Sequence, residues 1–284
     1  MEMDRLRPGG RVLPEALEAL STHGRADWRK VPEITLYFWI IKVLCTTVGE
    51  TAADFLNINL RFGLTNSTYI MGILLLVTLF FQFMVRKYVP RIYWLAVVLI
   101  SIVGTQITDN LTDNLGVSLV TTTIVFGVAL VATFAAWYAC EKTLSIHTIY
   151  TFRREAFYWL AILFTFALGT SAGDLTAERF NLGYLVSAVM FGALIAIVTV
   201  AHVRFKLNAV LAFWIAYILT RPLGASLGDY LSQAHGVGGL GLGTVVTSAL
   251  FLITILGTVV YLTITKKDVA RAQDSGRITH EAVA

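Results

Sequence analysis

Aspartates recur four times in this chain at one position of a repeated motif. They are Asp54, Asp109, Asp174 and Asp229. Further polar side chains lie four residues away from them, namely Glu50, Asp113, Glu178 and Gln233. Because residues four apart share one face of an α-helix, each such pair presents its polar atoms on the same side. Polar residues such as Thr105, Gln106 and Thr170 crowd the same turns.

Carboxylates are hard oxygen ligands, which suit magnesium, manganese or calcium, and they also exchange protons. We therefore expect the seven acidic residues to bind substrate or ions, with the four motif aspartates as candidate metal ligands. Zinc and copper sites usually recruit imidazole or thiolate, and no histidine lies in a motif. The cation expected at the acids is a divalent metal, a proton or an organic cation. We expect no resident cofactor, and Cys45 and Cys140 are interpreted as buried, inert thiols.

The aspartates belong to the pattern Phe/Tyr-Trp-x9-Gly-x4-Asp, which occurs four times. Its copies begin at Phe38, Tyr93, Tyr158 and Phe213. The first and third copies are as far apart as the second and fourth, which is what duplication of a pair of units would leave. We therefore expect one body of four repeated units rather than four independent domains.

The composition indicates a membrane protein. Hydrophobic residues make up 56% of the chain and charged residues 14%, far from the average of soluble domains. Apolar stretches long enough to span a bilayer lie at about 34–56, 69–85, 92–111, 118–139, 156–175, 185–202, 209–231 and 245–265. The expected fold is all-α, with eight transmembrane helices, two in each repeat.

The domain organisation follows from these stretches. Residues 31–265 are the expected transmembrane domain, with repeats at about 31–88, 89–142, 153–206 and 207–265. Residues 1–30 are expected to be a cytosolic arm and residues 266–284 a cytosolic tail. Two helices in each repeat give all four units the same orientation, so the repeats are predicted to be parallel and to surround an axis along the membrane normal.

Lysine and arginine are concentrated in alternate loops, before the first stretch, after the last and after each even-numbered one. Cytoplasmic loops carry such an excess, so both termini are predicted to be cytoplasmic. The net charge of +4 is interpreted as a topology signal and not as a sign of nucleic-acid binding. The four motif tryptophans, Trp39, Trp94, Trp159 and Trp214, are expected to form an interfacial aromatic belt.

Lys42 and Arg221 break the symmetry of the repeats, because other residue types occupy the same positions elsewhere. Each lies within a predicted spanning helix, so each is expected to have a carboxylate partner on another helix and to act as a counter-charge or coupling group. Pro222 follows Arg221 and is expected to break its helix. The alternative interpretation of the aspartates is structural, since they lie near helix ends.

The four motif copies, with Lys30-Val31-Pro32-Glu33-Ile34-Thr35 and the stretch 220–229, resemble bacterial integral membrane proteins built from a fourfold repeat of unknown function. The resemblance covers about residues 30–265. It implies a bacterial inner-membrane protein and supplies no substrate.

The sequence lacks the zinc-protease motif, the nucleophile elbow and the phosphate-binding loop, so an enzyme is not expected. The predicted function is a secondary transporter of a small cation, with manganese or magnesium as the leading candidates. A pseudo-fourfold cation channel and a non-transporting sensor or assembly partner are the alternatives. The expected partners are the lipid bilayer and a small cation or proton, and self-association into a homo-oligomer stays open.

Overall fold

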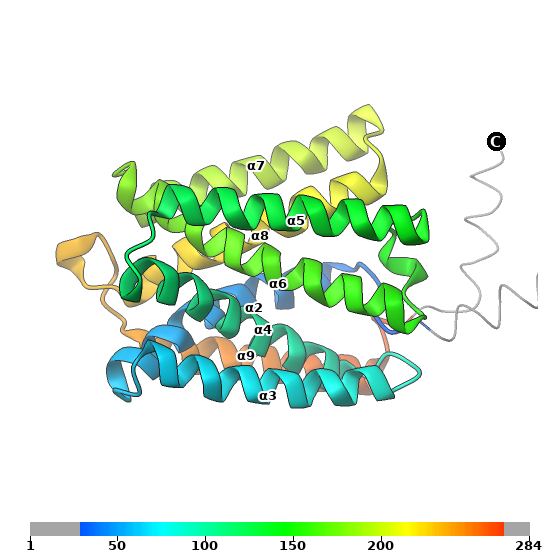
Figure 1. Ribbon diagram of the computed structural model, residues 1–284, viewed down its shortest axis with the longest axis horizontal. Coiled ribbons are helices and arrows are strands. Elements are labelled where there is room, and N and C mark those ends of the chain that lie inside the picture. The colour runs from blue at the N-terminus through cyan, green and yellow to red at the C-terminus, as the bar shows by residue number, and fades with distance from the viewer. Residues whose placement is uncertain (1–28, 270–284) are drawn as a thin grey trace, which may run out of the picture.

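The computed structural model describes residues 29–269. The expected cytosolic arm, except for its last two residues, and most of the expected tail lie outside this range. Within it the chain forms long helices and no strand. The long helices are α2 (Leu36–Asp54), α3 (Leu64–Met84), α4 (Pro90–Asp109), α5 (Leu119–Glu141), α6 (Phe152–Asp174), α7 (Tyr184–Phe205), α8 (Ala209–Ser232) and α9 (Thr244–Thr265). All eight are long and apolar enough to cross a membrane, which confirms the expected fold class (Figure 1).

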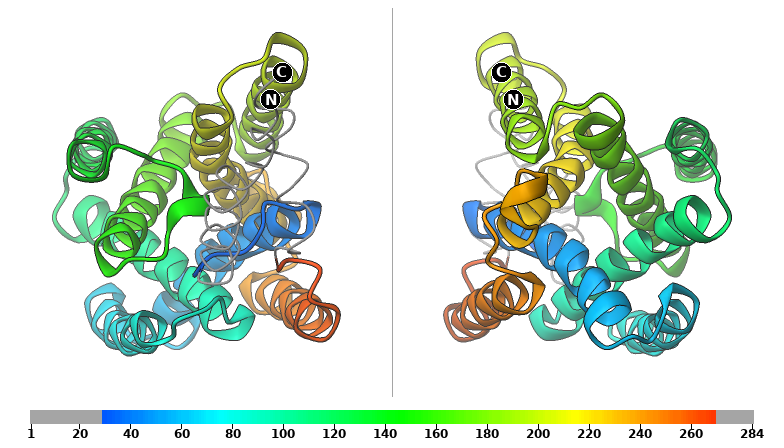
Figure 2. Two further views of the ribbon diagram at one scale, coloured as in Figure 1. Left: turned by 90° about the vertical axis from the view of Figure 1, so that its right-hand side faces the viewer. Right: turned by 90° about the vertical axis from the view of Figure 1, so that its left-hand side faces the viewer.

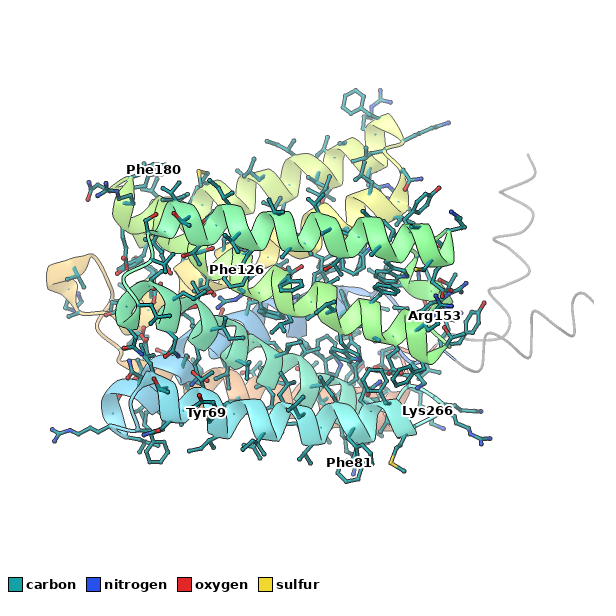
Figure 3. All side chains as sticks on the ribbon, viewed as in Figure 1. Tyr69, Phe81, Phe126, Arg153, Phe180 and Lys266 are labelled. Atoms are coloured by element: carbon teal, nitrogen blue, oxygen red, sulfur yellow. The ribbon has the colours of Figure 1, made fainter. Side chains whose placement is uncertain are left out.

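The helices form an inner and an outer set. The first helix of each repeat (α2, α4, α6 and α8) is mostly buried inside the protein, whereas less than a third of each second helix (α3, α5, α7 and α9) is buried. Figure 2 shows the second helices at the periphery, around the crossed inner helices. Apolar side chains such as Tyr69 and Phe81 project outward from α3 (Figure 3), as expected of surfaces that face lipid.

Each outer helix packs on the inner helix of the next repeat rather than on its own. Helix α3 lies against α4, α5 against α6 and α7 against α8, and α9 returns to α2. The inner helices contact one another in the order α2, α4, α6, α8 and back to α2. The four parallel repeats therefore form a closed ring around one axis.

The motif glycines are the points where neighbouring inner helices cross. A Cβ atom on any of them would overlap a residue of the next helix. The overlapping pairs are Gly49 with Ser101, Gly104 with Phe166, Gly169 with Arg221, and Gly224 with Thr46. In every pair the partner lies three residues before the glycine of its own motif. The repeated glycine is thus required for close helix approach, as in other membrane helix pairs.

The inner helices widen directly after the motif aspartate in three repeats. Single π-helical turns follow there at η1 (Phe55–Asn59), η2 (Asn110–Asn114) and η4 (Leu175–Arg179). Such turns are frequent at functional sites. The fourth helix, α8, instead stays α-helical through Pro222 to Ser232, so the expected break at Pro222 is wrong. The proline ring packs against Gly169 and Gly173 of α6, and this close packing keeps α8 continuous.

Both ends of the described chain lie at one end of the bundle, called here the terminal end. The Glu33 amide donates a 2.9 Å hydrogen bond to the Asp268 carbonyl. Arg153 and Lys266 lie at this end, and Phe180 at the opposite, acidic end (Figure 3). The first residues, 29–35, are called the terminal strap, because they join the loops of several repeats. Lys30 donates its amide to the Ile149 carbonyl, and the Arg29 carbonyl accepts from the Tyr88 amide.

Candidate functional site

Side chains at equivalent motif positions of the four inner helices form layers along the ring axis, with one residue from each helix in every layer. Successive layers are four residues apart in the sequence. From the terminal end, the aromatic layer contains Phe38, Tyr93, Tyr158 and Phe213. The lysine layer contains Lys42, Val97, Ile162 and Tyr217, and the arginine layer contains Thr46, Ser101, Phe166 and Arg221. The glutamate layer contains Glu50, Thr105, Thr170 and Ala225, and the aspartate layer contains the four motif aspartates. All residues of the lysine and arginine layers are 0% exposed, so these two layers form the core of the ring.

Arg221 joins all four repeats at the centre of this stack. Its Nη2 lies 2.8 Å from Glu50 Oε2 and 2.7 Å from Thr170 Oγ1, and it also donates to Thr105 Oγ1. Its partners come from the same layer of the three other repeats. The expected carboxylate partner of Arg221 is therefore Glu50, held in a fully buried ion pair that two threonines complete.

Lys42 differs from Arg221, because it forms no ion pair. Its Nζ has no hydrogen-bond partner among the described residues. The amine lies over two aromatic rings instead, 3.8 Å from the Phe166 centroid and 4.1 Å from the Tyr217 centroid. The expected carboxylate partner of Lys42 is thus wrong, since neither its own layer nor the aromatic and arginine layers on either side contain an acid. Cation–π attraction offsets part of the cost of burying this group.

The acids become more exposed from the centre toward the acidic end. Glu50 and Asp229 are buried, Asp54, Asp109 and Asp174 are partly exposed, and Asp113 and Glu178 are exposed. The Gln233 amide, at the end of α8, donates to Asp54 Oδ2 of the neighbouring α2 at 3.3 Å. The predicted site residues therefore follow one axis, which leads from the acidic end to the buried Glu50–Arg221 pair.

The motif aspartates do not form a compact ligand cluster. Within residues 29–269, no group of three or more histidine, cysteine, aspartate or glutamate side chains is arranged to hold a metal ion. The aspartate layer instead presents its carboxylates around the axis at the point where three of the helices widen into π-turns. Such an arrangement can attract cations and pass them inward, without the closed coordination of a structural metal site.

The aromatic layer packs around the axis, nearer to the terminal end than the lysine and arginine layers. Each first aromatic residue of a motif contacts the tryptophan of the next repeat. The ring centroids are 5.7 Å apart for Phe38 and Trp94, 5.5 Å for Tyr93 and Trp159, 6.2 Å for Tyr158 and Trp214, and 5.7 Å for Phe213 and Trp39. The expected interfacial belt is wrong for Trp94, Trp159 and Trp214, which are all buried. Their large flat surfaces join adjacent repeats.

Sequence reasoning treated Thr105 and Thr170 only as polar neighbours of the acids, although they are direct partners of Arg221. The sequence did contain a signal for this role, because both threonines immediately follow a motif glycine, as Glu50 does. The aromatic residues around Lys42 were also missed. Phe166 and Tyr217 occupy layer positions that become meaningful only when the order of the helices around the ring is known.

A second buried ion pair lies under the terminal strap. Lys30 Nζ donates to Glu155 Oε2 at 2.6 Å and to the Phe83 carbonyl at 3.0 Å. Glu155 Oε1 also accepts from Gln82 Nε2 at 3.0 Å. Tyr88 lies beside the strap and donates to Asp268 at 2.6 Å. Burial, together with this neighbouring carboxylate, raises the pKa of the Tyr88 hydroxyl far above its ordinary value, so Tyr88 stays a donor at any physiological pH.

Comparison with known protein families identifies the repeats. The family model described as Repeat of Unknown Function (DUF347) matches four times, at residues 37–88, 92–143, 157–208 and 212–268. Each match contains one inner helix and the outer helix that follows it. Searches of curated proteins and of solved structures found no match.

Proposed function

We propose that this chain, which belongs to the family built from that repeat, is a secondary transporter of a small cation. The description of the family names no activity, so the proposal is drawn from the site. The observation that carries the proposal is the contact of Arg221 with Glu50, Thr105 and Thr170. A positively charged group already occupies an oxygen-lined position on the ring axis. Ionisable groups inside membrane proteins usually mark a substrate or ion pathway.

The acids provide a route to this position. A cation that enters from the acidic end meets the exposed Asp113 and Glu178, then the motif aspartates, and finally Glu50. Each step exchanges some hydration for carboxylate oxygens. The side chain of Arg221 neutralises Glu50 when no substrate is bound, so the buried site does not carry an uncompensated charge.

The aromatic layer favours a transporter over an open channel. Its buried rings join neighbouring helices all around the axis, between the buried cations and the terminal end. In our proposal, a cation leaves the centre only when neighbouring repeats move relative to each other and part these rings. In our proposal the inner helices rock about the glycine crossings, where they approach most closely.

We further propose a bacterial inner-membrane location with the terminal end in the cytoplasm. This proposal is supported by charge, because the loops at the acidic end contain only Arg61 and Arg179 as basic residues within the described chain. The axis is formed by one chain, so the proposed activity does not require a homo-oligomer.

Cation flux into proteoliposomes tests the function. We expect a selective, saturable flux for at least one member of a panel that contains manganese, magnesium, protons and small organic cations. Asp109→Asn and Asp174→Asn should each reduce this flux at least about tenfold, because each removes a carboxylate from the route. Glu141→Gln is the matched control, since Glu141 pairs with Arg154 away from the axis.

Three outcomes would contradict the proposal. Equal flux in the aspartate variants and the wild type would make the aspartates structural. A sustained conductance, without coupling to a second ion, would favour the channel. If no cation of the panel crossed the membrane, the sensor or assembly role would be favoured instead.

A further inference from the structure

The Arg221 guanidinium occupies a position that the three other repeats form together. One nitrogen, Nη2, contacts one oxygen each from Glu50, Thr105 and Thr170. These residues hold the same place in their motifs, directly after the glycine. The fourth repeat has Ala225 there and contributes the guanidinium from one turn away. The three oxygens, called here the oxygen triad, thus belong to the repeat architecture, and Arg221 is their occupant.

The oxygen triad presents acceptors. The one proton of Thr105 Oγ1 is donated to the Ser101 carbonyl at 3.2 Å or to Glu50 Oε2 at 3.5 Å, and Thr170 Oγ1 donates to the Phe166 carbonyl at 3.1 Å. A hydroxyl has a single proton to donate, so the lone pairs of both threonines remain for the axis. With the carboxylate of Glu50, the triad accepts up to three hydrogen bonds from one group. Such a site recognises a cation that carries N–H donors.

Ligand number and charge distinguish this group from a divalent metal. Magnesium and calcium each bind six or more oxygen ligands in proteins, whereas Arg221 Nη2 is held by one oxygen from each of three residues. The triad supplies three oxygens and one negative charge. A divalent ion would bring a surplus charge into a core that already contains Lys42 and Arg221, both fully buried, and this is costly.

Arg221 fits the triad incompletely. Its Nε and Nη1 are buried and have no hydrogen-bond partner among the described residues. Buried donors without partners cost free energy, which weakens the hold of the triad on its own arginine. A free primary ammonium ion, which carries all its N–H donors on one nitrogen, does not have this restriction and can therefore compete.

Building on the proposed function, we infer that the oxygen triad is the position at which the substrate binds. The substrate class is a monovalent cation with N–H donors, such as a guanidinium or a primary ammonium ion. Arg221 competes with this substrate for the triad. Substrate entry releases Arg221 from Glu50, and substrate exit allows the pair to re-form. The charge of Glu50 is thereby neutralised throughout the cycle, first by Arg221 and then by the substrate.

Thermal unfolding in detergent tests this inference without any transport. Arg221→Ala vacates the triad, and methylguanidinium chloride at millimolar concentration is the probe. We expect the probe to raise the Tm of Arg221→Ala by about 5 °C at a hundredfold excess over its Kd. The wild type should respond less than half as much, because its own arginine occupies the site. Sodium, magnesium and manganese chlorides at matched ionic strength should have no such effect.

Glu50→Gln/Arg221→Ala is the matched control, since it retains the space but lacks the carboxylate. It should lose the response to methylguanidinium. A response that persists in this double variant, or an equal response of Arg221→Ala to magnesium or manganese, would overturn the inference. So would the absence of any response.

The pair variant Glu50→Gln/Arg221→Gln controls for folding. It removes both charges together, which buried pairs tolerate better than the loss of one partner. If this variant folds while Arg221→Ala remains unfolded even with methylguanidinium present, the triad does not bind the probe and the inference is wrong. Binding by Arg221→Ala combined with a wild type that transports nothing would contradict the proposed function alone.

Discussion

At the residue scale, the described part of the chain contains two buried lysines in opposite situations. Lys30 contacts Glu155 and a backbone carbonyl, whereas Lys42 lies over aromatic rings without a hydrogen-bond partner among the described residues. A buried ammonium group is stable only when other groups compensate its lost hydration. Lys30 is therefore a structural residue, and Lys42 is retained at a cost to stability, as expected of a functional group.

Replacement of each lysine by methionine should separate these roles. Lys42→Met removes an unpaired charge and keeps the side-chain length, so the free energy of unfolding should rise by about 1–3 kcal/mol. Lys30→Met leaves Glu155 without its counter-charge and should lower the free energy of unfolding by about 3–5 kcal/mol. Thermal unfolding in detergent measures both changes. Shifts of the same sign in the two variants would refute this distinction.

The proposed role of Lys42 also predicts a functional effect. As a counter-charge next to the arginine layer, it should influence the exchange of cations at Glu50. Lys42→Met should therefore reduce the coupled flux in proteoliposomes at least about fivefold despite its higher stability. A variant that is more stable and equally active would assign Lys42 no part in transport.

At the element scale, the glycine crossings determine how the inner helices approach. Sequence periodicity predicts the number and type of helices well, because hydropathy and motif spacing are local properties. It could not predict that α3 packs on α4 rather than on its own inner helix α2. All four repeats carry the same pattern, so packing within a repeat and packing with the next repeat are equally compatible with it.

The same limitation applies to the candidate site. The sequence indicates that Arg221 needs a carboxylate partner, yet it contains seven acids at suitable depths. Which of these acids pairs with Arg221 depends on how the four inner helices are placed around the ring. The threonines that complete the site have no distinctive sequence signal, because threonine is common in these helices.

Gly104→Ala tests the crossings. Its added methyl group would overlap Phe166 and approach the Ala167 backbone nitrogen to 3.3 Å, where a backbone atom cannot easily yield. We expect this variant to lose about 1–3 kcal/mol of stability through overpacking. Gly72→Ala is the matched control, because nothing lies within 4 Å of its added atom, and it should gain about 0.5–1 kcal/mol of helix propensity. Equal changes in thermal unfolding would show that helix approach does not require the motif glycine.

At the scale of the whole molecule, the ring has two chemically different ends. The acidic end presents Asp113 and Glu178, and the terminal end gathers the basic loops and the strap. Between them lie the oxygen triad and the packed aromatic layer. In the proposed transporter, this polarity corresponds to a conformation in which cations enter from the acidic end and are stopped at the terminal end, one of the two that alternating access requires.

Cysteine labelling in intact cells tests the proposed orientation. The native Cys45 and Cys140 are first replaced by serine, since Cys140 is exposed. Asp113→Cys should then react with a membrane-impermeant maleimide added from outside, whereas Lys267→Cys should react only after the membrane is opened. The reverse pattern would invert the topology, and labelling of both from outside would contradict the assignment of opposite ends.

The most direct test of the central claim is the current that a sudden cation jump produces in proteoliposomes adsorbed on a solid support. The wild type should give a transient, saturable current, which Glu141→Gln retains and which Glu50→Gln reduces at least about tenfold, because Glu50 is the one carboxylate in the oxygen triad. Equal currents in the wild type and Glu50→Gln would contradict a cation path through the ring axis.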